Sequence, residues 1–321
     1  MKSRSKKVER IVALGTMTFG GQTNRSTAER MLDRFLDEGY TWIDTAYMYN
    51  DGRTERMLGG LLKGKRRRRV FLATKAYPGR PRGFKATGRL TPQSIRRQID
   101  TSLKRLRTDH VELFYLHAPD NKTPLEVSLG TCQALKEEGK IGEVGMSNYA
   151  AWQVAEAVGI CLRNDWAPPM IFQGMYNPIT RDIERECITA CRHFGVDFIA
   201  YNPLAGGLLT GKHLGAESIP KKGRFSGAYY RDRFWKEEYF EAVALLQAAS
   251  RRSRIPLTEA TLRWLMHHGR NDGVLLGASR MEHLEQNLAA CGKGPLSPTF
   301  RKAFDGAWEI ARPACQRYFR D

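Results

Sequence analysis

Four side chains of the types that donate a proton to a carbonyl oxygen stand near the ends of short apolar runs: Asp44, Tyr49, Lys75 and His117. A tyrosine hydroxyl has an unperturbed pKa of about 10, which is too high for an efficient acid at neutral pH. A nearby ammonium lowers that pKa, so Lys75 is predicted to activate Tyr49, with Asp44 holding Lys75 in place. A neutral His117 is predicted to orient the substrate carbonyl.

Each of these residues has an ordinary structural explanation when it is taken alone. Tyr49 is more often a packed aromatic, and Lys75 a solvated surface residue. His117 could be a core histidine with satisfied hydrogen bonds, and Asp44 the cap of a helix or turn. Together, at the ends of three consecutive apolar runs, they favour a reaction site over four separate structural roles.

Strand-like apolar runs alternate with amphipathic stretches along most of the chain. The eight runs are Ile11–Leu14, Thr41–Ile43, Val70–Ala73, Val111–Tyr115, Glu143–Met146, Met170–Phe172, Phe198–Ala200 and Gly273–Leu276. The helix candidates are residues 26–38, 53–62, 92–106, 124–138, 149–163, 182–194, 256–268 and 281–290. Eight strand–helix units predict an α/β fold, a closed (β/α)8 TIM barrel with a parallel sheet. No linker interrupts the alternation, so residues 1–321 are predicted to form a single domain.

Two segments depart from this alternation. Residues 206–238, after the seventh run, form a long irregular stretch rich in glycine, basic and aromatic residues. A loop of that length in a compact domain is usually functional. The second segment is the C-terminal tail, residues 295–321, which adds one helix-like stretch, Phe300–Ala311.

Hydride for carbonyl reduction must come from a cofactor, because no side chain supplies one. The stretch Gly15–Gly21 does not match the GxGxxG fingerprint, so the phosphate site is predicted after the seventh and eighth strands, as in many barrels. Gly206–Lys212 suits that role through its flexible glycines and its terminal cation. Ser279 and Arg280 precede the last barrel helix and form an anion site, where a 2′-phosphate would select NADPH over NADH. Ser279 could also be a plain helix cap.

The formal net charge is +18, which suggests a nucleic-acid partner, an acidic surface or anionic small molecules. The densest basic run, Lys65–Arg69, is predicted to be a solvated loop. The sequence has no zinc finger, basic zipper or RNA-binding sheet signature, so a nucleic-acid partner is not expected.

The six cysteines are scattered, which suggests a reducing compartment, and the spacing of Cys187 and Cys191 is more typical of a helix core than of a metal site. No apolar run approaches the roughly 18 residues that span a bilayer. The basic N-terminus lacks the apolar stretch of a signal peptide. A cytoplasmic protein without membrane contact or metal is therefore predicted.

The motifs around these residues resemble the aldo-keto reductase family. The stretches that carry this resemblance are Trp42–Ala46 with Tyr49, Ala73–Lys75, Tyr115–His117 and Gly145–Tyr149. A closer resemblance, to the aflatoxin aldehyde reductase and succinic semialdehyde reductase subfamily, is carried by Phe172–Asn177, Tyr201–Lys212, Arg233–Glu237, Leu284–Ala290 and Tyr318–Arg320. The similarity runs from about Leu14 to Arg320, nearly the whole chain.

The resemblance implies a barrel that binds NADPH and reduces aldehydes to alcohols, with succinic semialdehyde, dicarbonyls or aflatoxin dialdehyde-like compounds as substrates. It also implies a homodimer, as is common in the family. The implied catalytic residues are Asp44, Tyr49, Lys75 and His117. The implied cofactor contacts are Ser147, Asn148, Gln173, Tyr201, Asn202, Pro203, Leu204, Gly206, Gly207, Leu208, Gly211, Lys212, Arg224, Ser279, Arg280, His283, Gln286 and Asn287. The implied substrate contacts are His117, Tyr230, Arg233 and Arg320.

Two positions depart from the subfamily pattern. His283 stands where glutamine is usual, and Arg280 where serine is frequent, and both belong to the adenosine end of the implied cofactor site. An alternative function is a cofactor-sensing regulatory subunit, since the fold also resembles the potassium-channel β-subunits, which keep the same four residues. The subfamily motifs in the C-terminal half favour an enzyme. Nucleic-acid association through the basic surface is a third hypothesis.

Overall fold

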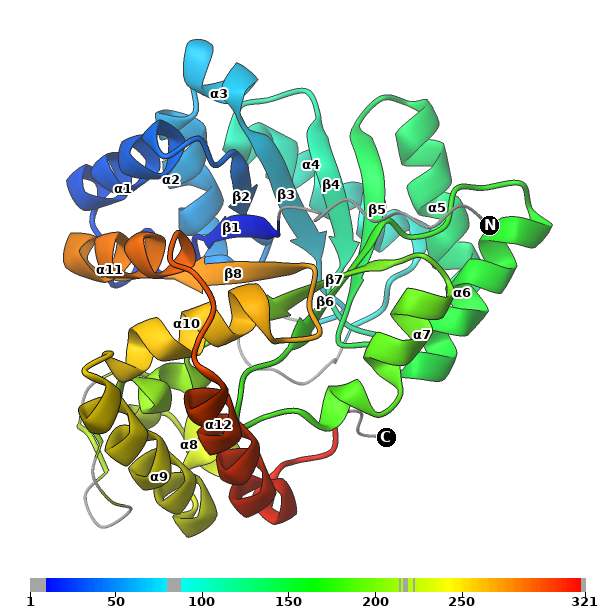
Figure 1. The fold of residues 1–321 in the computed structure, drawn as a ribbon. Helices are drawn as coiled ribbons and strands as arrows, with labels where there is room; N and C mark the ends of the chain where they lie inside the picture. Colours follow the sequence, from blue (N-terminus) through cyan, green and yellow to red (C-terminus); the bar gives the residue numbers. More distant parts are fainter. Residues whose placement is uncertain (1–9, 80–87, 214, 216–218, 222, 319–321) are drawn as a thin grey trace.

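Eight parallel strands close into a barrel in which each strand pairs with the next and β8 pairs with β1 (Figure 1). The computed structural model describes residues 10–79, 88–213, 215, 219–221 and 223–318. The strands are β1 (Ile11–Gly15), β2 (Trp42–Asp44), β3 (Phe71–Ala76), β4 (Val111–Leu116), β5 (Ile141–Ser147), β6 (Ile171–Met175), β7 (Asp197–Tyr201) and β8 (Gly273–Gly277). The predicted (β/α)8 barrel is therefore confirmed.

One helix of the outer ring follows each strand. These helices are α1 (Arg25–Asp37), α2 (Arg53–Leu61), α4 (Pro92–Leu106), α5 (Leu125–Glu137), α6 (Ala151–Arg163), α7 (Cys187–His193), α10 (Leu257–His267) and α11 (Met281–Cys291). Their beginnings carry helix-start chemistry: the side chain of Asn24 accepts from the Thr27 N–H at α1, and Thr91 caps α4, which opens on Pro92. No helix in the described ranges is both long enough and apolar enough to span a bilayer.

Strand register brings the site residues to one end of the barrel. Lys75 is level with Tyr115, and Ser147 with Gln173, while Gly15 pairs with Asp44. Alternate residues point into the barrel, where Tyr115 belongs to an inner core with Leu113, Ile171 and Ile199, among others. This packed interior closes the barrel below its carboxyl end, and the predicted site residues lie above it, at the mouth.

The basic run Lys65–Arg69 was predicted to be a solvated loop; none of its residues is buried, but the prediction of a loop is wrong. It forms a short helix, α3 (Lys65–Arg69), between α2 and β3. Arg66 binds Glu29 and Asp33 of α1, with contacts of 2.8 and 2.7 Å. Carboxylates on neighbouring elements neutralise part of this run, a tertiary effect that local charge patterning does not reveal.

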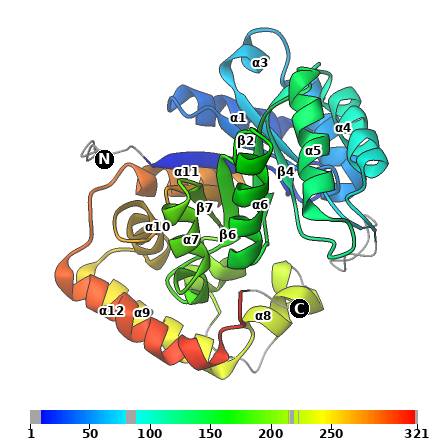
Figure 2. The ribbon, with the colours of Figure 1, turned by 90° about the vertical axis from the view of Figure 1, so that its right-hand side faces the viewer.

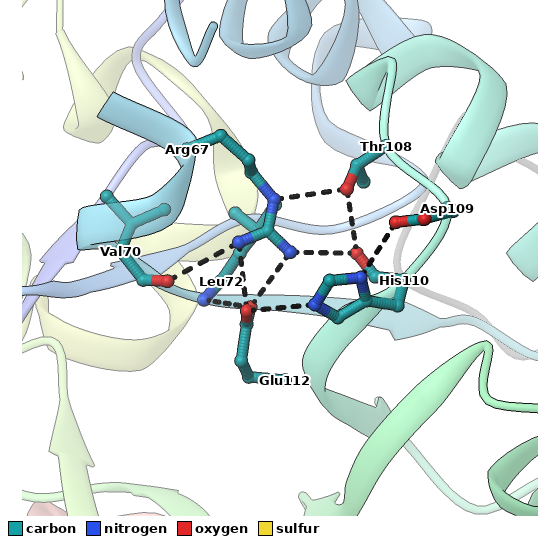
Figure 3. Close-up of polar contacts among 7 residues, drawn as sticks. All are labelled: Arg67, Val70, Leu72, Thr108, Asp109, His110 and Glu112. Carbon is teal, nitrogen blue, oxygen red and sulfur yellow. Dashed lines mark hydrogen bonds and ion pairs between the residues drawn. The ribbon is translucent and has the colours of Figure 1, made fainter. Parts of the chain in front are cut away.

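Arg67 connects α3 to the start of β4 (Figure 3). Its guanidinium binds both carboxylate oxygens of Glu112, at 2.9 and 3.2 Å, and donates to Thr108 Oγ1 and the His110 carbonyl. Glu112 also accepts from the Leu72 N–H of β3 at 2.8 Å. The network lies at the amino ends of β3 and β4, away from the mouth.

The long segment after β7 is more ordered than predicted. It contains the 3₁₀ turns η3 (Ala205–Thr210) and η4 (Arg224–Ser226) and the helix α8 (Ala228–Phe234). The helix α9 (Glu237–Ser253) was missed, and it packs beside α12 (Pro298–Ala311), as Figures 1 and 2 show. Its burial depends on this distant partner helix, which explains why the local sequence pattern did not reveal it.

Candidate active site

A buried ion pair joins β2 and β3 at the mouth of the barrel. Lys75 Nζ donates to Asp44 Oδ1 and, at 2.7 Å, to the Thr45 carbonyl. Gln173 Nε2 of β6 donates to the other oxygen of Asp44 at 2.9 Å. Lys75 and Asp44 are almost completely buried. Burial lowers the pKa of Lys75, and Asp44 acts in the opposite direction. The predicted pairing of these two residues is confirmed.

Tyr49 begins the 3₁₀ turn η1 (Tyr49–Gly52), which follows β2. Lys75 Nζ lies 5.4 Å from the centroid of its ring. The ring is edge-on to that of His117, with 5.9 Å between their centroids. Sequence placed Tyr49, Lys75 and His117 at three separate strand ends, and the fold brings them together.

The electrostatics of Tyr49 differ from the prediction. Lys75 was expected to lower the pKa of Tyr49, but burial, followed by the charge of Asp44, raises it well above the usual value. The reason is that Asp44 balances the charge of Lys75, while the phenolate would lose its hydration. The hydroxyl is therefore firmly protonated in the protein alone.

His117 follows β4 and lies between two aromatic edges. Its ring centroid is 5.9 Å from that of Tyr49 and 5.5 Å from that of Tyr77. Burial, followed by the charge of Lys75, lowers the pKa of His117 well below 6.5, so the imidazole is neutral, as predicted. Its Nδ1 is buried without a hydrogen-bond partner among the described residues. A buried polar atom in this condition is suited to a hydrogen bond with a ligand.

The residues predicted to contact the nicotinamide form one continuous hydrogen-bond chain. Tyr201 donates to Asn148 Oδ1 at 2.8 Å, and Asn148 Nδ2 donates to the His117 carbonyl and to Ser147 Oγ. Ser147 in turn donates to the Gln173 carbonyl at 2.9 Å. Because Gln173 also binds Asp44, the chain runs from β7 to the ion pair. A chain of amide and hydroxyl groups of this kind offers both donors and acceptors to an amide-bearing ring.

The predicted phosphate segment is a glycine-containing turn. Asn202 Oδ1 accepts from the Gly206 N–H at 2.7 Å, and both residues have positive φ. A side chain at Gly206 would press on the Tyr230 ring, whereas one at Gly207 would meet nothing within 4 Å. The open backbone at Gly207 is compatible with an anion cradle. Pro203 and Leu208 are buried, Leu204 and Gly211 are partly exposed, and Lys212 is exposed.

The residues predicted for the adenosine end lie at the start of α11. Arg280 is the N-cap, and Ser279 therefore precedes the cap rather than providing it. His283 and Gln286 are exposed, whereas Asn287 is buried. Although its side chain is exposed, partial desolvation, followed by the charges of Arg280 and Lys212, lowers the pKa of His283. These neighbouring cations form a positive site that fits a phosphate.

The residues predicted to bind the substrate are only partly described. Arg233 of α8 lies with its guanidinium 4.5 Å from the Tyr229 ring centroid and 3.4 Å from Met175 Sδ at the end of β6. Tyr230 lies with its ring centroid 5.3 Å from the guanidinium of Arg224, a residue predicted for the adenosine end of the cofactor. The last predicted residue, Arg320, lies outside the described residues.

Sequence reasoning missed a second buried carboxylate near the site, Glu55 of α2. An acidic residue in the first turn of a helix is common, because it complements the helix dipole. The sequence therefore held no signal that would separate Glu55 from an ordinary surface residue.

The fold and the site define a closed (β/α)8 barrel that gathers a neutral histidine, a protonated tyrosine and a buried lysine–aspartate pair at its mouth, groups whose chemistry suits proton donation to a carbonyl. The model of the aldo/keto reductase family matches residues 11–309, and the chain belongs to that family. It is 48% identical to human aflatoxin B1 aldehyde reductase member 2, over 96% of this chain and 89% of the relative. It is 46% identical to human aldo-keto reductase family 7 member A3, over 96% of both chains. A more distant relative, the uncharacterized oxidoreductase YrpG of Bacillus subtilis, is 30% identical over 87% of this chain and 86% of the relative.

The present protein is therefore an oxidoreductase of a family that uses nicotinamide cofactors.

Proposed function

We propose that this protein reduces aldehydes to alcohols with NADPH and that Tyr49 supplies the proton. The observation that supports this most directly is the meeting of Tyr49 with neutral His117 beside the buried Lys75–Asp44 pair. Its relatives include proteins named aflatoxin B1 aldehyde reductase, which favours aldehydes as the substrate class.

The residues divide the work as follows. Bound NADPH would supply the hydride. His117, whose imidazole is neutral, orients the carbonyl oxygen toward Tyr49. Tyr49 then gives its hydroxyl proton to the alkoxide oxygen. An alkoxide is a much stronger base than a phenolate, so this transfer is favourable even with the raised pKa of Tyr49. Lys75, with its Nζ 5.4 Å from the ring centroid of Tyr49, would offset only the part of the phenolate charge that Asp44 leaves to it.

The cofactor end favours a phosphorylated dinucleotide. Lys212 and Arg280 form a positive site around His283 near the start of α11, where a helix N-terminus adds partial positive charge. We propose that this site binds the 2′-phosphate of NADPH. Arg280 is suited to this because a guanidinium binds phosphate with two parallel hydrogen bonds.

The substrate end favours a carboxylated or dicarbonyl aldehyde. Arg233 lies near Tyr201 and the end of β6, within the arc of elements that surround the mouth. A guanidinium there can hold a carboxylate. We propose succinic semialdehyde-like compounds, dicarbonyls and aflatoxin dialdehyde-like compounds as the candidate substrates, with Arg233, Tyr230 and Arg320 contacting them.

The test is a panel of carboxylated and neutral aldehydes, with NADPH and NADH in parallel, on the wild type and Tyr49→Phe. We expect Tyr49→Phe to lose at least about a hundredfold in kcat, because general acid catalysis typically contributes 10²–10⁴-fold. Tyr47→Phe is the matched control, since it removes a hydroxyl from the same loop. Near-normal turnover in Tyr49→Phe would refute the proposed acid. Tight NADPH binding with negligible wild-type turnover would instead favour a cofactor-sensing regulator.

We also propose that residues 1–321 act as one cytoplasmic barrel domain, that the protein is a homodimer and that it has no membrane or nucleic-acid partner. Light scattering coupled to size-exclusion chromatography tests the dimer, and a purely monomeric mass would refute it.

A further inference from the structure

A buried carboxylate lies behind the barrel wall, close to the proposed site. Glu55 of α2 is completely buried. One of its oxygens accepts from Thr74 Oγ1 at 2.7 Å, and the other binds Arg105 Nη1 of α4 at 3.1 Å. A buried charge is retained only when it is paired and hydrogen-bonded. Both oxygens of Glu55 meet that condition.

Arg105 extends this network to the segment that carries Tyr49. Its Nη1 also donates to the Tyr47 carbonyl at 2.9 Å, and its guanidinium lies 4.7 Å from the Tyr47 ring centroid. The Tyr47 N–H donates to the Lys75 carbonyl at 3.2 Å. Tyr47 therefore lies between Arg105 and β3, two residues before Tyr49.

Thr74 extends the network to Lys75. Successive strand residues face opposite sides of a sheet, so Lys75 points to the mouth while Thr74 points toward the helices and Glu55. Burial lowers the pKa of Lys75, whereas the carboxylates of Asp44 and Glu55 both act to raise it. Glu55 thus influences Lys75 through the backbone and through its charge.

The approach of Arg105 depends on Gly52. This residue has a φ of 80°, in the left-handed region, and a side chain there would overlap the Arg105 guanidinium. The turn that carries Tyr49 is thereby shaped to admit a cation from α4.

We propose that Glu55 and Arg105 are positioning residues that hold Tyr49 in register with Lys75 at the mouth of the barrel. Arg105 fixes the Tyr47 carbonyl and Thr74 fixes the strand that bears Lys75, and Glu55 joins the two. The inference rests on the proposed role of Tyr49 as the proton donor. It assigns a function to residues that do not touch the substrate.

The test uses Glu55→Gln, which keeps the size of the side chain and removes its charge. The one acceptor oxygen of glutamine cannot serve Thr74 and Arg105 at once in the present geometry, and its contact with Arg105 loses the charge, so Arg105 holds the turn less firmly. We expect kcat to fall about 10- to 100-fold, as for a small misplacement of reacting groups. NADPH affinity, read from quenching of protein fluorescence, should stay within about twofold, because the proposed cofactor residues lie on the β5–β8 side.

The pH profile of kcat gives a readout that a purely structural role would not change. The groups that face Lys75 are Asp44, Tyr49, Tyr115 and His117, and the charge of Glu55 acts on Lys75 from behind the strand. Removing the charge of Glu55 takes away one influence that raises the pKa of Lys75. The alkaline limb of the profile should therefore move to lower pH in Glu55→Gln.

Glu112→Gln is the matched control, because it breaks another Glu–Arg pair at the opposite end of β4 (Figure 3). It should change stability while leaving kcat and the pH profile unchanged. Within the network, Arg105→Met should lose kcat, and Arg105→Lys should recover part of it. If Glu55→Gln does not fold, Arg105→Lys and Arg105→Met decide the question in its place.

The outcomes separate this inference from the proposed function. If Tyr49→Phe is inactive while Glu55→Gln and Arg105→Met keep normal kcat and pH profiles, the positioning role is wrong and the proton donor stands. If Tyr49→Phe stays active, the proposed function itself fails. Loss of kcat in Glu55→Gln and Tyr49→Phe, but not in Glu112→Gln, supports both.

Discussion

Burial sets the protonation states of the residues at the mouth. It raises the pKa of Tyr49 and lowers those of Lys75 and His117, each by disfavouring the charged form. The resulting phenol and neutral imidazole are the forms that a proton donor and a carbonyl-orienting group require. Asp44 keeps the buried ammonium paired, so the site holds charge without exposing it to water.

His283 offers a residue-scale prediction about pH. Partial desolvation, followed by the charges of Arg280 and Lys212, lowers its pKa, and Glu282 opposes them. A bound 2′-phosphate would favour the imidazolium, so NADPH binding should take up a proton and strengthen as the pH falls toward about 6. In His283→Gln this pH dependence should disappear, with a loss of up to about tenfold in affinity at the lower pH, or about 1.4 kcal/mol.

Isothermal titration calorimetry in two buffers of different ionisation enthalpy measures that proton uptake directly. NADH, which lacks the 2′-phosphate, is the control ligand and should show little dependence on His283. Equal pH dependence for NADPH in the wild type and His283→Gln would place the phosphate elsewhere.

At the scale of elements, α3 connects α1 to the start of β4 at the amino end of the barrel. Some of its arginines are paired within the protein, unlike those of a free basic loop. Arg66 holds α1, and Arg67 holds the start of β4 through Glu112 (Figure 3). Arg69 adds a hydrogen bond to the Leu36 carbonyl at 2.9 Å. Three of the five cations of this run are thus engaged within the protein, which reduces its value as a polyanion site.

Removing Arg67 tests this role of α3. Arg67→Met should lower the free energy of unfolding by about 1–3 kcal/mol, because the partly buried Glu112 loses a bidentate partner. Urea unfolding followed by circular dichroism measures the change. Lys65→Met, in the same helix, is the control and should have little effect. Similar losses in both variants would mean that general charge, not the Arg67–Glu112 contact, is responsible.

At the scale of the whole molecule, the net charge of +18 opposes compaction. Carboxylates that are paired or hydrogen-bonded in the fold offset part of this repulsion. Burial acts to raise the pKa of Asp120. The hydrogen bonds that Asp120 accepts from the backbone N–H groups of Thr123, Leu90 and Lys122 outweigh burial and lower that pKa. Lys293 and Arg263 likewise lower the pKa of Glu259 against the effect of burial.

Acid stability follows from this balance. A carboxylate whose pKa is lowered in the folded state stabilises the fold when the pH is above its pKa in the unfolded chain, about 4. That contribution is lost as the pH falls through its pKa in the folded state. Protonation also adds to the positive charge. We expect the thermal midpoint to drop by at least about 5 °C between about pH 6 and pH 3.5. Added salt should recover part of the loss by screening repulsion, as scanning fluorimetry can measure. A midpoint insensitive to salt at low pH would contradict this account.

The sequence by itself determined the barrel and most of the site at its mouth. Strand and helix periodicities are local properties, so the eight units were visible without long-range information. The rule that parallel strands present their carboxyl ends on one side then grouped Asp44, Lys75 and His117. The sequence also marked Tyr49 and the glycine turn after β7, because their motifs are continuous in the chain.

Only the tertiary structure decided features that depend on distant partners. Helix α9 is buried by α12, the arginines of α3 find carboxylates on α1 and β4, and Glu55 meets Arg105 from α4. The direction of the Tyr49 pKa also needed the fold, since burial and the neutralising Asp44 outweigh a single nearby ammonium. Spacing identifies which groups meet, whereas the environment they share sets their charge.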